Sequence, residues 1–197
     1  IYLFISPFFA AMAIGSDLKA EIEKYTTPKW KLSQTQKKYL LEHIVISDAT
    51  VETKNEQQSF ALKAMALHKK KCYRALRKLS RLEDYSNLID FIKTSTYNDK
   101  SQLFTLHADH PLLPYPMIIH IIVKRPKKQG HYVFSFPTGM FRGLTGHFDI
   151  KQIKNKCLFY AESFWRGSPT KIPDFAIEIF SETLSQIAGK ILMRKSQ

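Results

Sequence analysis

The hydrophobic pattern changes its period several times along the chain. Residues 59–68 place Phe60, Leu62, Ala64 and Ala66 at alternate positions, which predicts a strand covered on one face. From Cys72 the apolar residues recur every three or four positions, which predicts a short amphipathic helix, and a further helical turn follows at 82–87. Strand patterns then recur over residues 89–97, 102–108, 117–123, 131–136, 144–153 and 157–166.

The carboxyl-terminal segment returns to the helical period. Pro173 suits the first turn of a helix, and Glu178, Glu182 and Lys190 fall outside one wide apolar stripe. A long amphipathic helix that follows a run of antiparallel strands must lay its apolar face across the sheet. The order of one strand, two short helices, six strands and one long helix is therefore the main structural prediction. The stripe contains Ala176, Ile177, Phe180, Leu184, Ile187, Ala188, Ile191 and Leu192.

The amino-terminal part of the chain follows a different pattern. Residues 1–13 are uncharged and almost wholly apolar, and they end in Ala-Met-Ala, which is typical of a signal-peptide core with its cleavage site. A buried strand or helix is the alternative. Residues 16–58 are polar, with a helical pattern at 34–43, a short strand at 44–46 and a turn at 47–50.

Composition narrows the class of protein. Of 197 residues, 44% are hydrophobic, which favours a folded domain over a disordered one. The formal net charge of +13 permits attraction to phosphate-rich surfaces, whether nucleic acid or anionic lipid. The 2 cysteines are too few for a disulfide scaffold or an all-cysteine zinc site.

Three local patterns accompany the order of elements. The helical segment after the first strand begins at Cys72 and ends near the aromatic Tyr85. Several glycines interrupt residues 139–148. Gly or Pro pairs at 167–175 precede the final helix. With the order of elements, these patterns resemble the START-like helix-grip superfamily, in the branch of polyketide cyclases and coenzyme Q-binding proteins. The resemblance covers residues 59–195.

The resemblance implies an α+β helix-grip fold. In that fold a curved seven-stranded antiparallel sheet wraps around a long C-terminal helix, with two short helices after the first strand. The chain then divides into the signal segment 1–13, an N-terminal extension at 14–58 that packs on the domain, and a START-like ligand-binding domain at 59–197. Family members carry lipids, quinones, sterols or polyketides in a cavity between sheet and helix, and a minority act on them catalytically.

We expect such a cavity to be lined by apolar residues of the strands and of the final helix. The alternative is that the same side chains fill a solid core. The candidate cavity residues are Ile119, Ile121, Phe134, Phe136, Phe148, Phe159, Ile177, Phe180 and Leu184.

The resemblance also makes a disulfide a candidate. It implies that the first and last strands are antiparallel neighbours, so that His68 lies beside Cys157. Cys72 follows His68 closely, which brings the two sulfurs within bridging distance. An exported protein meets oxidising conditions in which such a pair bonds. Two buried free thiols are the alternative.

A run of seven cations without an acid occupies the polar positions of the first short helix. It is a candidate surface for docking on an anionic membrane. Nucleic-acid binding is less favoured because the aromatic residues lie in strands with apolar neighbours, and a solvated helix face is the remaining alternative. The cations are Lys69, Lys70, Lys71, Arg74, Arg77, Lys78 and Arg81.

The histidines do not form a recognisable site in the sequence. His107 and Asp109 share a strand face while His110 points away, and no further cluster has metal-ligand spacing. His147 and Asp149 also share a face but lack an evident nucleophile, and His120 interrupts an apolar strand. We therefore expect no metal, no cofactor and no catalytic residue.

The function predicted from these observations is binding or transport of a hydrophobic small molecule, without catalysis, by a monomer in the periplasm or outside the cell. The partners are the small molecule and an anionic membrane surface, with no nucleic acid. The alternatives are a cyclase- or hydrolase-type enzyme that acts in the same cavity, and an interaction module without a ligand.

Overall fold

The computed structural model describes residues 18–25, 30–111, 115–139 and 141–196. The predicted signal segment at 1–13 lies outside these described residues. Within the described ranges, no helix has both the length and the apolar character that crossing a bilayer requires.

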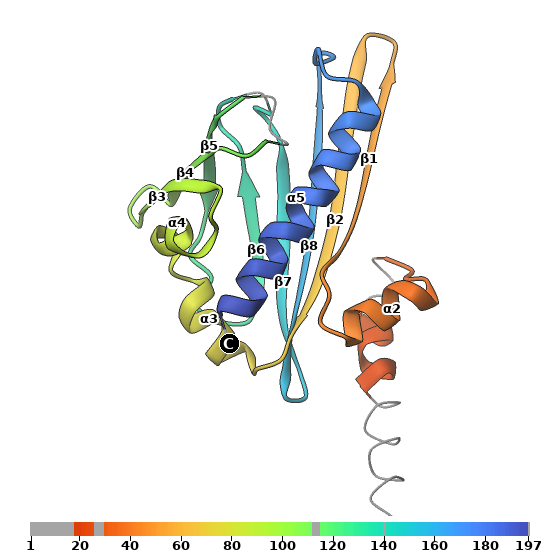
Figure 1. Ribbon diagram of the computed structural model, residues 1–197, viewed down its shortest axis with the longest axis vertical. Helices are drawn as coiled ribbons and strands as arrows, with labels where there is room; N and C mark the ends of the chain where they lie inside the picture. Colours follow the sequence, from red (N-terminus) through yellow and green to blue (C-terminus); the bar gives the residue numbers. More distant parts are fainter. Residues whose placement is uncertain (1–17, 26–29, 112–114, 140, 197) are drawn as a thin grey trace, which may run out of the picture.

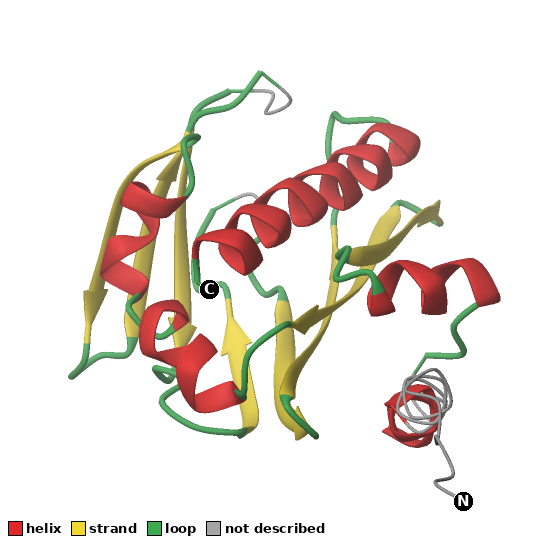
Figure 2. Cartoon of the chain, turned by 60° about the horizontal axis from the view of Figure 1, so that its bottom comes forward, coloured by secondary structure: helices red, strands yellow, loops and turns green. Residues whose placement is uncertain are grey.

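One antiparallel sheet in the order β1-β2-β8-β7-β6-β5-β4-β3 forms the framework of the fold. Its strands curve around the long helix α5, Asp174–Lys195 (Figure 2). β2 pairs with β8 in the register that places His68 opposite Cys157, so the expected pairing of these strands is confirmed. The strands are β1 Ile46–Lys54, β2 Gln57–His68, β3 Ile92–Asn98, β4 Leu103–Ala108, β5 Met117–Val123, β6 Gly130–Ser135, β7 Thr145–Ile153 and β8 Lys156–Gly167.

The sheet contains eight strands, one more than the seven expected. The additional strand is β1, which pairs with β2 along its whole length. It includes residues 47–50, so the predicted turn at that place is wrong. β1 is an edge strand, and only Ile46, Ala49 and Val51 are buried, so its remaining polar positions conceal the alternating pattern.

The helices lie on both sides of the sheet. The concave face carries α5 and the short helices α3, η1 and α4 (Figures 1 and 2). The opposite face carries the amino-terminal helical residues 18–25 and α2. There Ile22 and Leu40 pack against Met65 and Tyr160. A capping box between Ser33 and Gln36 begins α2. The helices are α2 Gln34–Leu41, α3 Cys72–Leu79, η1 Leu82–Asp84, α4 Tyr85–Leu88 and α5 Asp174–Lys195.

Three carboxylates of α5 bind the free edge of β1. They follow one another at intervals of four residues, and they accept hydrogen bonds from alternate backbone N–H groups of the strand. Four residues of helix rise about 6 Å and two residues of strand about 6.6–6.8 Å, so the two spacings match. The bonds join Thr53 N to Asp174 Oδ2 at 2.9 Å, Val51 N to Glu178 Oε1 at 2.7 Å and Ala49 N to Glu182 Oε1 at 2.8 Å.

The carboxyl end of α5 is held by a second set of bonds. The N–H of Lys70 donates to His68 Nδ1 at 3.0 Å, and the Oγ of Ser196 lies 3.2 Å from His68 Nε2. Burial lowers the pKa of His68, so its imidazole is neutral near pH 7. Because Nδ1 accepts, Nε2 carries the proton and donates to Ser196. α5 is therefore attached to β1 along its first half and to β2 at its end.

Removing an acceptor of the carboxylate ladder will destabilise the fold. We expect Glu178→Ala and Glu182→Ala each to lower the free energy of unfolding by about 1–2 kcal/mol, because each leaves an edge N–H without its charged acceptor. Urea denaturation at pH 7 measures the change. Glu21→Ala is the control, because Glu21 is an exposed helical carboxylate away from the ladder. An equal loss in the control would contradict the assignment.

The ladder will also make stability depend on pH. Hydrogen bonds from Gln58 and Thr53 hold the pKa of Asp174 below its ordinary 3.8. A lowered pKa contributes stability that is complete above the ordinary value and is lost as the pH falls through the lowered one. We expect unfolding curves to show this loss below about pH 4 and Asp174→Asn to reduce it. An unchanged acid profile in Asp174→Asn would show that other carboxyl groups cause it.

Candidate functional site

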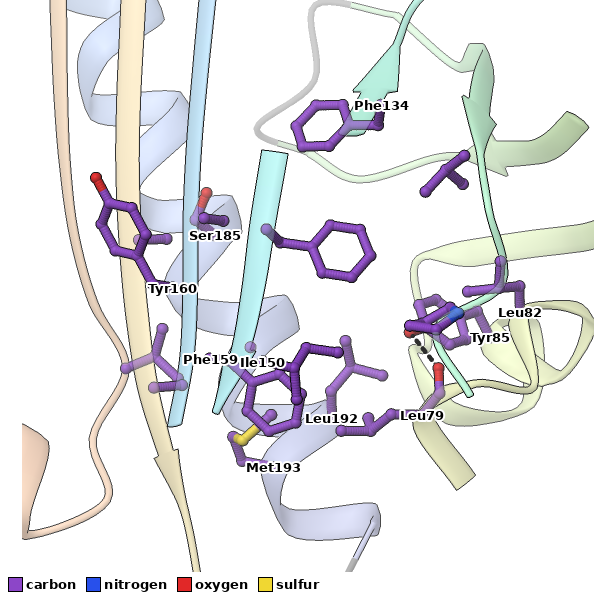
Figure 3. Close-up of a pocket in the computed structure, with 18 of the residues that line it drawn as sticks. Leu79, Leu82, Tyr85, Phe134, Ile150, Phe159, Tyr160, Ser185, Leu192 and Met193 are labelled. Carbon is purple, nitrogen blue, oxygen red and sulfur yellow. Dashed lines mark hydrogen bonds between the residues drawn. The ribbon is translucent and has the colours of Figure 1, made fainter. Parts of the chain in front are cut away.

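A cavity of about 420 Å³ lies between the concave face of the sheet and the second half of α5 (Figure 3). This volume is in the range of small-molecule pockets in proteins, about 300–1,000 Å³. Its wall is almost entirely apolar. Besides strand residues, it contains Leu76, Leu79, Leu82 and Tyr85 of the short helices and Ser185, Gly189, Leu192 and Met193 of α5.

The structure places five of the nine candidate cavity residues in this wall. Four of them lie on strands, and Phe136 follows directly after the end of β6. They are Ile121, Phe134, Phe136, Phe148 and Phe159.

The other four candidates do not line the cavity. Ile177 is buried against Phe60 and Trp165 under the first half of α5. Ile119 packs against the cluster of Ile89 and neighbouring residues. Phe180 and Leu184 are half-buried and lie outside the wall. Of the residues in the predicted stripe, Leu192 alone belongs to the wall, so the cavity lies mostly under positions of α5 beside the stripe.

The cavity-facing line on α5 runs through residues 185, 189, 192 and 193. Its helical spacing is visible in the sequence, but Ser185 and Gly189 are too small or too polar to mark a buried face. These small side chains leave the space open. A Cβ at Gly189 would lie 3.0 Å from the Val45 side chain, so glycine also lets the helix approach the chain just before β1.

Gly146 shapes the opposite wall. It pairs across strands with Phe134, and a Cβ there would lie 2.5 Å from the Phe134 ring and would also meet the Glu162 carbonyl oxygen. Because glycine has no side chain, the ring can lie over β7. It thereby joins a row of aromatic rings in which Tyr132 stacks on Phe148 with 5.2 Å between ring centroids.

The few polar groups of the wall are not arranged for acid–base chemistry. The Tyr85 hydroxyl donates to the Leu79 carbonyl at 2.9 Å, and burial raises the pKa of Tyr85, so this phenol stays neutral (Figure 3). Tyr160 directs its ring to the outer face of the sheet and donates to Glu162 at 3.0 Å. Ser185 has no hydrogen-bond partner in the described part of the chain, which leaves its hydroxyl available to a ligand.

A disulfide joins the two cysteines. Cys72 begins α3 and Cys157 lies at the start of β8, with 2.01 Å between the sulfurs and 4.7 Å between the Cα atoms. The bond lies in a buried cluster with Leu76, Leu79 and Ile150, which also line the cavity. It therefore fixes one wall of the cavity to the sheet.

Arg125 holds the short helices on the other side. Its guanidinium donates to Glu83 at 2.7 Å, to the Ser80 carbonyl at 2.9 Å and to Asp99, and it stacks on the Tyr97 ring at 4.4 Å. The adjacent Pro126 lines the cavity. The wall made by α3, η1 and α4 is thus attached by the disulfide at the start of α3 and by Arg125 around the start of η1.

The predicted basic surface lies on the outer side of the same wall. All seven cations are exposed, while Cys72, Ala75, Leu76 and Leu79 of α3 are buried. Lys78 Nζ donates to the Lys195 carbonyl at 3.0 Å, which places the surface beside the end of α5 (Figure 1). The cations are Lys69, Lys70, Lys71, Arg74, Arg77, Lys78 and Arg81.

Comparisons with known proteins identify the fold. No family profile and no curated protein matches the sequence. Among solved structures, a START superfamily protein from Mycobacterium smegmatis is 11% identical with a TM-score of 0.56, over 68% of this chain and 95% of that one. The Zhui aromatase/cyclase from Streptomyces sp. R1128 is 6% identical with a TM-score of 0.57, over 70% of this chain and 93% of that one.

A third structure, Ara h 8.0201, is 7% identical with a TM-score of 0.53, and the match covers 70% of this chain and 97% of that one. At these identities the likeness concerns the fold alone. The chain has a START-like helix-grip fold, an α+β architecture in which an open antiparallel sheet surrounds a long C-terminal helix.

Loss of the disulfide will lower stability substantially. The two cysteines are 85 residues apart, and in the chain-entropy model closure of such a loop stabilises by about 4–5 kcal/mol. We expect Cys72→Ala/Cys157→Ala to lose an amount of this order in denaturant unfolding. Wild-type protein with reductant is the control and should lose the same. Two titratable thiols in unfolded protein without reductant would rule out the bond.

Proposed function

We propose that this protein binds a hydrophobic small molecule in the cavity and carries it without chemical change. The observation that supports the proposal is the wall itself, which surrounds about 420 Å³ with apolar side chains of strands and helices. Water in such a space forms few hydrogen bonds, so an apolar ligand displaces it at little cost.

The wall provides sufficient binding energy for a carrier. Burial of about 300 Å² of ligand surface at about 25 cal/mol per Å² contributes roughly 7 kcal/mol before the costs of association. The Ser185 hydroxyl offers one hydrogen bond to orient a polar group of the ligand. Lipid, quinone and polyketide-like molecules all combine a large apolar body with a few oxygens.

The composition of the wall supports carriage over catalysis. Of the described residues that line the cavity, none is a carboxylate, an imidazole or an amine, and Tyr85 is held neutral by burial. Ser185 has no base beside it in the wall, and a serine nucleophile needs one.

The basic surface of α3 favours an anionic membrane as the place of exchange. The inner side of the helix contributes Leu76 and Leu79 to the cavity, while its outer side presents exposed cations. A membrane bound at the outer side would therefore lie against a cavity wall. The disulfide and the apolar segment at 1–13 support a periplasmic or extracellular location, where disulfides persist.

A larger side chain in the wall will exclude the ligand. Ala64 faces the cavity from β2, so we expect Ala64→Leu to weaken binding of the neutral apolar probe N-phenyl-1-naphthylamine at least about tenfold, since the added carbons occupy probe volume. Fluorescence titration measures the affinity. Native mass spectrometry of the purified protein identifies any bound lipid.

The matched control is Ala61→Leu, because Ala61 lies on the same strand but on its other face. Ala61→Leu should bind the probe as the wild type does. Equal affinity in all three proteins would show that the probe binds elsewhere and would contradict the proposal. Chemical turnover of a bound polyketide or ester would show that the protein is an enzyme and would contradict the carrier proposal.

Charge reversal on the basic surface at and just before α3 will release the protein from anionic vesicles. We expect Lys69→Glu/Lys70→Glu/Arg74→Glu to weaken binding to phosphatidylglycerol vesicles at least about 100-fold, because each cation near the surface contributes about 1 kcal/mol. Vesicle sedimentation at low and high salt measures the binding.

The control is Lys31→Glu/Lys100→Glu/Lys171→Glu, which changes the net charge equally at exposed positions outside the basic surface. It should retain most of the vesicle affinity. Equal losses in both triple variants would show that net charge, rather than the α3 surface, causes the attraction.

A further inference from the structure

Two imidazoles and a carboxylate meet on the outer face of the sheet, on the opposite side from the cavity. His131 Nδ1 lies 2.7 Å from Asp149 Oδ1, and His147 Nε2 lies 4.0 Å from Asp149 Oδ2. The two imidazole rings are 4.7 Å apart between centroids. One ligand atom from each of the three residues lies within 4.8 Å of the others.

The strands place these residues together. His147 and Asp149 are two positions apart on β7 and therefore share its outer face, while Phe148 between them lines the cavity. His131 on β6 is the cross-strand partner of Asp149. The sequence shows that His147 and Asp149 share a face, but it does not show that His131 joins them. Only the register of β6 against β7 brings His131 to the same place.

We propose that His131, His147 and Asp149 bind a divalent transition-metal ion, and that zinc is the ion their chemistry fits best. Imidazole nitrogen and carboxylate oxygen are common zinc ligands at about 2.0–2.2 Å. In a tetrahedral site such bonds place neighbouring ligand atoms about 3.3 Å apart. The observed distances of 2.7 and 4.0 Å lie on either side of this value. All three ligand atoms lie within 4.8 Å of one another, so changes of no more than about 1.5 Å in their separations bring them to this spacing.

The surroundings suit an exchangeable metal site. The Asp149 side chain is only 8% exposed, so it is held in place, whereas that of His131 is 58% exposed and leaves room for a water ligand. Glu162 is the cross-strand partner of His147 and adds a second carboxylate beside the site. It accepts from Tyr160 at 3.0 Å and pairs with Lys63 at 3.5 Å. These two carboxylates offset locally the positive net charge of the chain.

A bound ion would connect β6 to β7 from outside. The inner faces of the same two strands contribute Phe134, Phe148 and Ile150 to the cavity wall. The metal site is therefore separate from the cavity and does not depend on the carrier proposal, although it stabilises strands that the cavity uses.

The test is a zinc titration of the full chain after treatment with a chelator. We expect one zinc ion per chain by isothermal titration calorimetry, together with a higher melting temperature. His131→Ala and His147→Ala should each weaken zinc binding at least about tenfold, as loss of a ligand does. Binding should also weaken from pH 7.5 to pH 5.5, because metal ligands must be deprotonated.

His120→Ala is the matched control. His120 also lies on the outer face, but it pairs with Thr105 at 3.0 Å and not with the cluster. It should bind zinc as the wild type does. Cobalt substitution gives a second readout, because a tetrahedral site with nitrogen and oxygen ligands absorbs visible light more strongly than the hexahydrated ion.

Three results would overturn the proposal. They are zinc binding that is unchanged in His131→Ala/His147→Ala, an equal loss of binding in His120→Ala, and no binding to the wild-type chain. Unfolding curves of both single variants without zinc show whether each is folded. His131→Ala is the safer variant, since the side chain of His131 is largely exposed.

Discussion

The carboxylate ladder between α5 and β1 is the interaction on which the rest of the structure depends. A long helix can lie on a curved sheet at many angles, and apolar contact alone does not choose between them. The carboxylates fix one angle between helix and sheet, because each accepts a hydrogen bond from the edge strand at a matching interval. They are Asp174, Glu178 and Glu182. The same bonds satisfy the exposed edge, which is otherwise a place for aggregation.

This attachment explains why the space beneath the helix stays open. The first half of α5 is held against β1, and its end is held by His68 and Ser196, so the helix cannot settle deeper into the sheet. Beneath its second half the facing residues are small, with Ser185 and Gly189 on the helix and Ala64 on β2. The disulfide fixes the remaining wall. A cavity results because the surrounding elements are fixed and the residues between them are too small to fill it.

The two faces of the sheet can then serve different chemistries. Alternate residues of β7 point to opposite sides, so Phe148 and Ile150 contribute to an apolar cavity while His147 and Asp149 contribute to a polar cluster. The basic outer side of α3 adds a third surface, adjacent to the cavity wall. One layer of strands thus separates the apolar cavity from the cluster of two imidazoles and a carboxylate.

Much of the architecture could be predicted from the sequence. The strands from β2 onward, the short helices and α5 follow from hydrophobic period, since each buries one face and the period reports that face. β1 was missed because it is an edge strand and many of its residues are polar and exposed, so no alternating hydrophobic pattern marks it. The carboxylates of α5 that accept hydrogen bonds from its backbone are distant in the sequence. In the cavity wall, large strand residues such as Phe134 and Phe148 were identified, whereas Ser185 and Gly189 were not.

The sequence by itself determined which faces of most strands and of α5 are apolar, and so the class of fold. Tertiary structure decided whether the buried space is filled, because a hydrophobic period reports contact with an apolar environment and not the volume left between elements. It also decided which polar residues meet. His131 and Asp149 are 18 positions apart, and only the register of two strands places them within hydrogen-bonding distance.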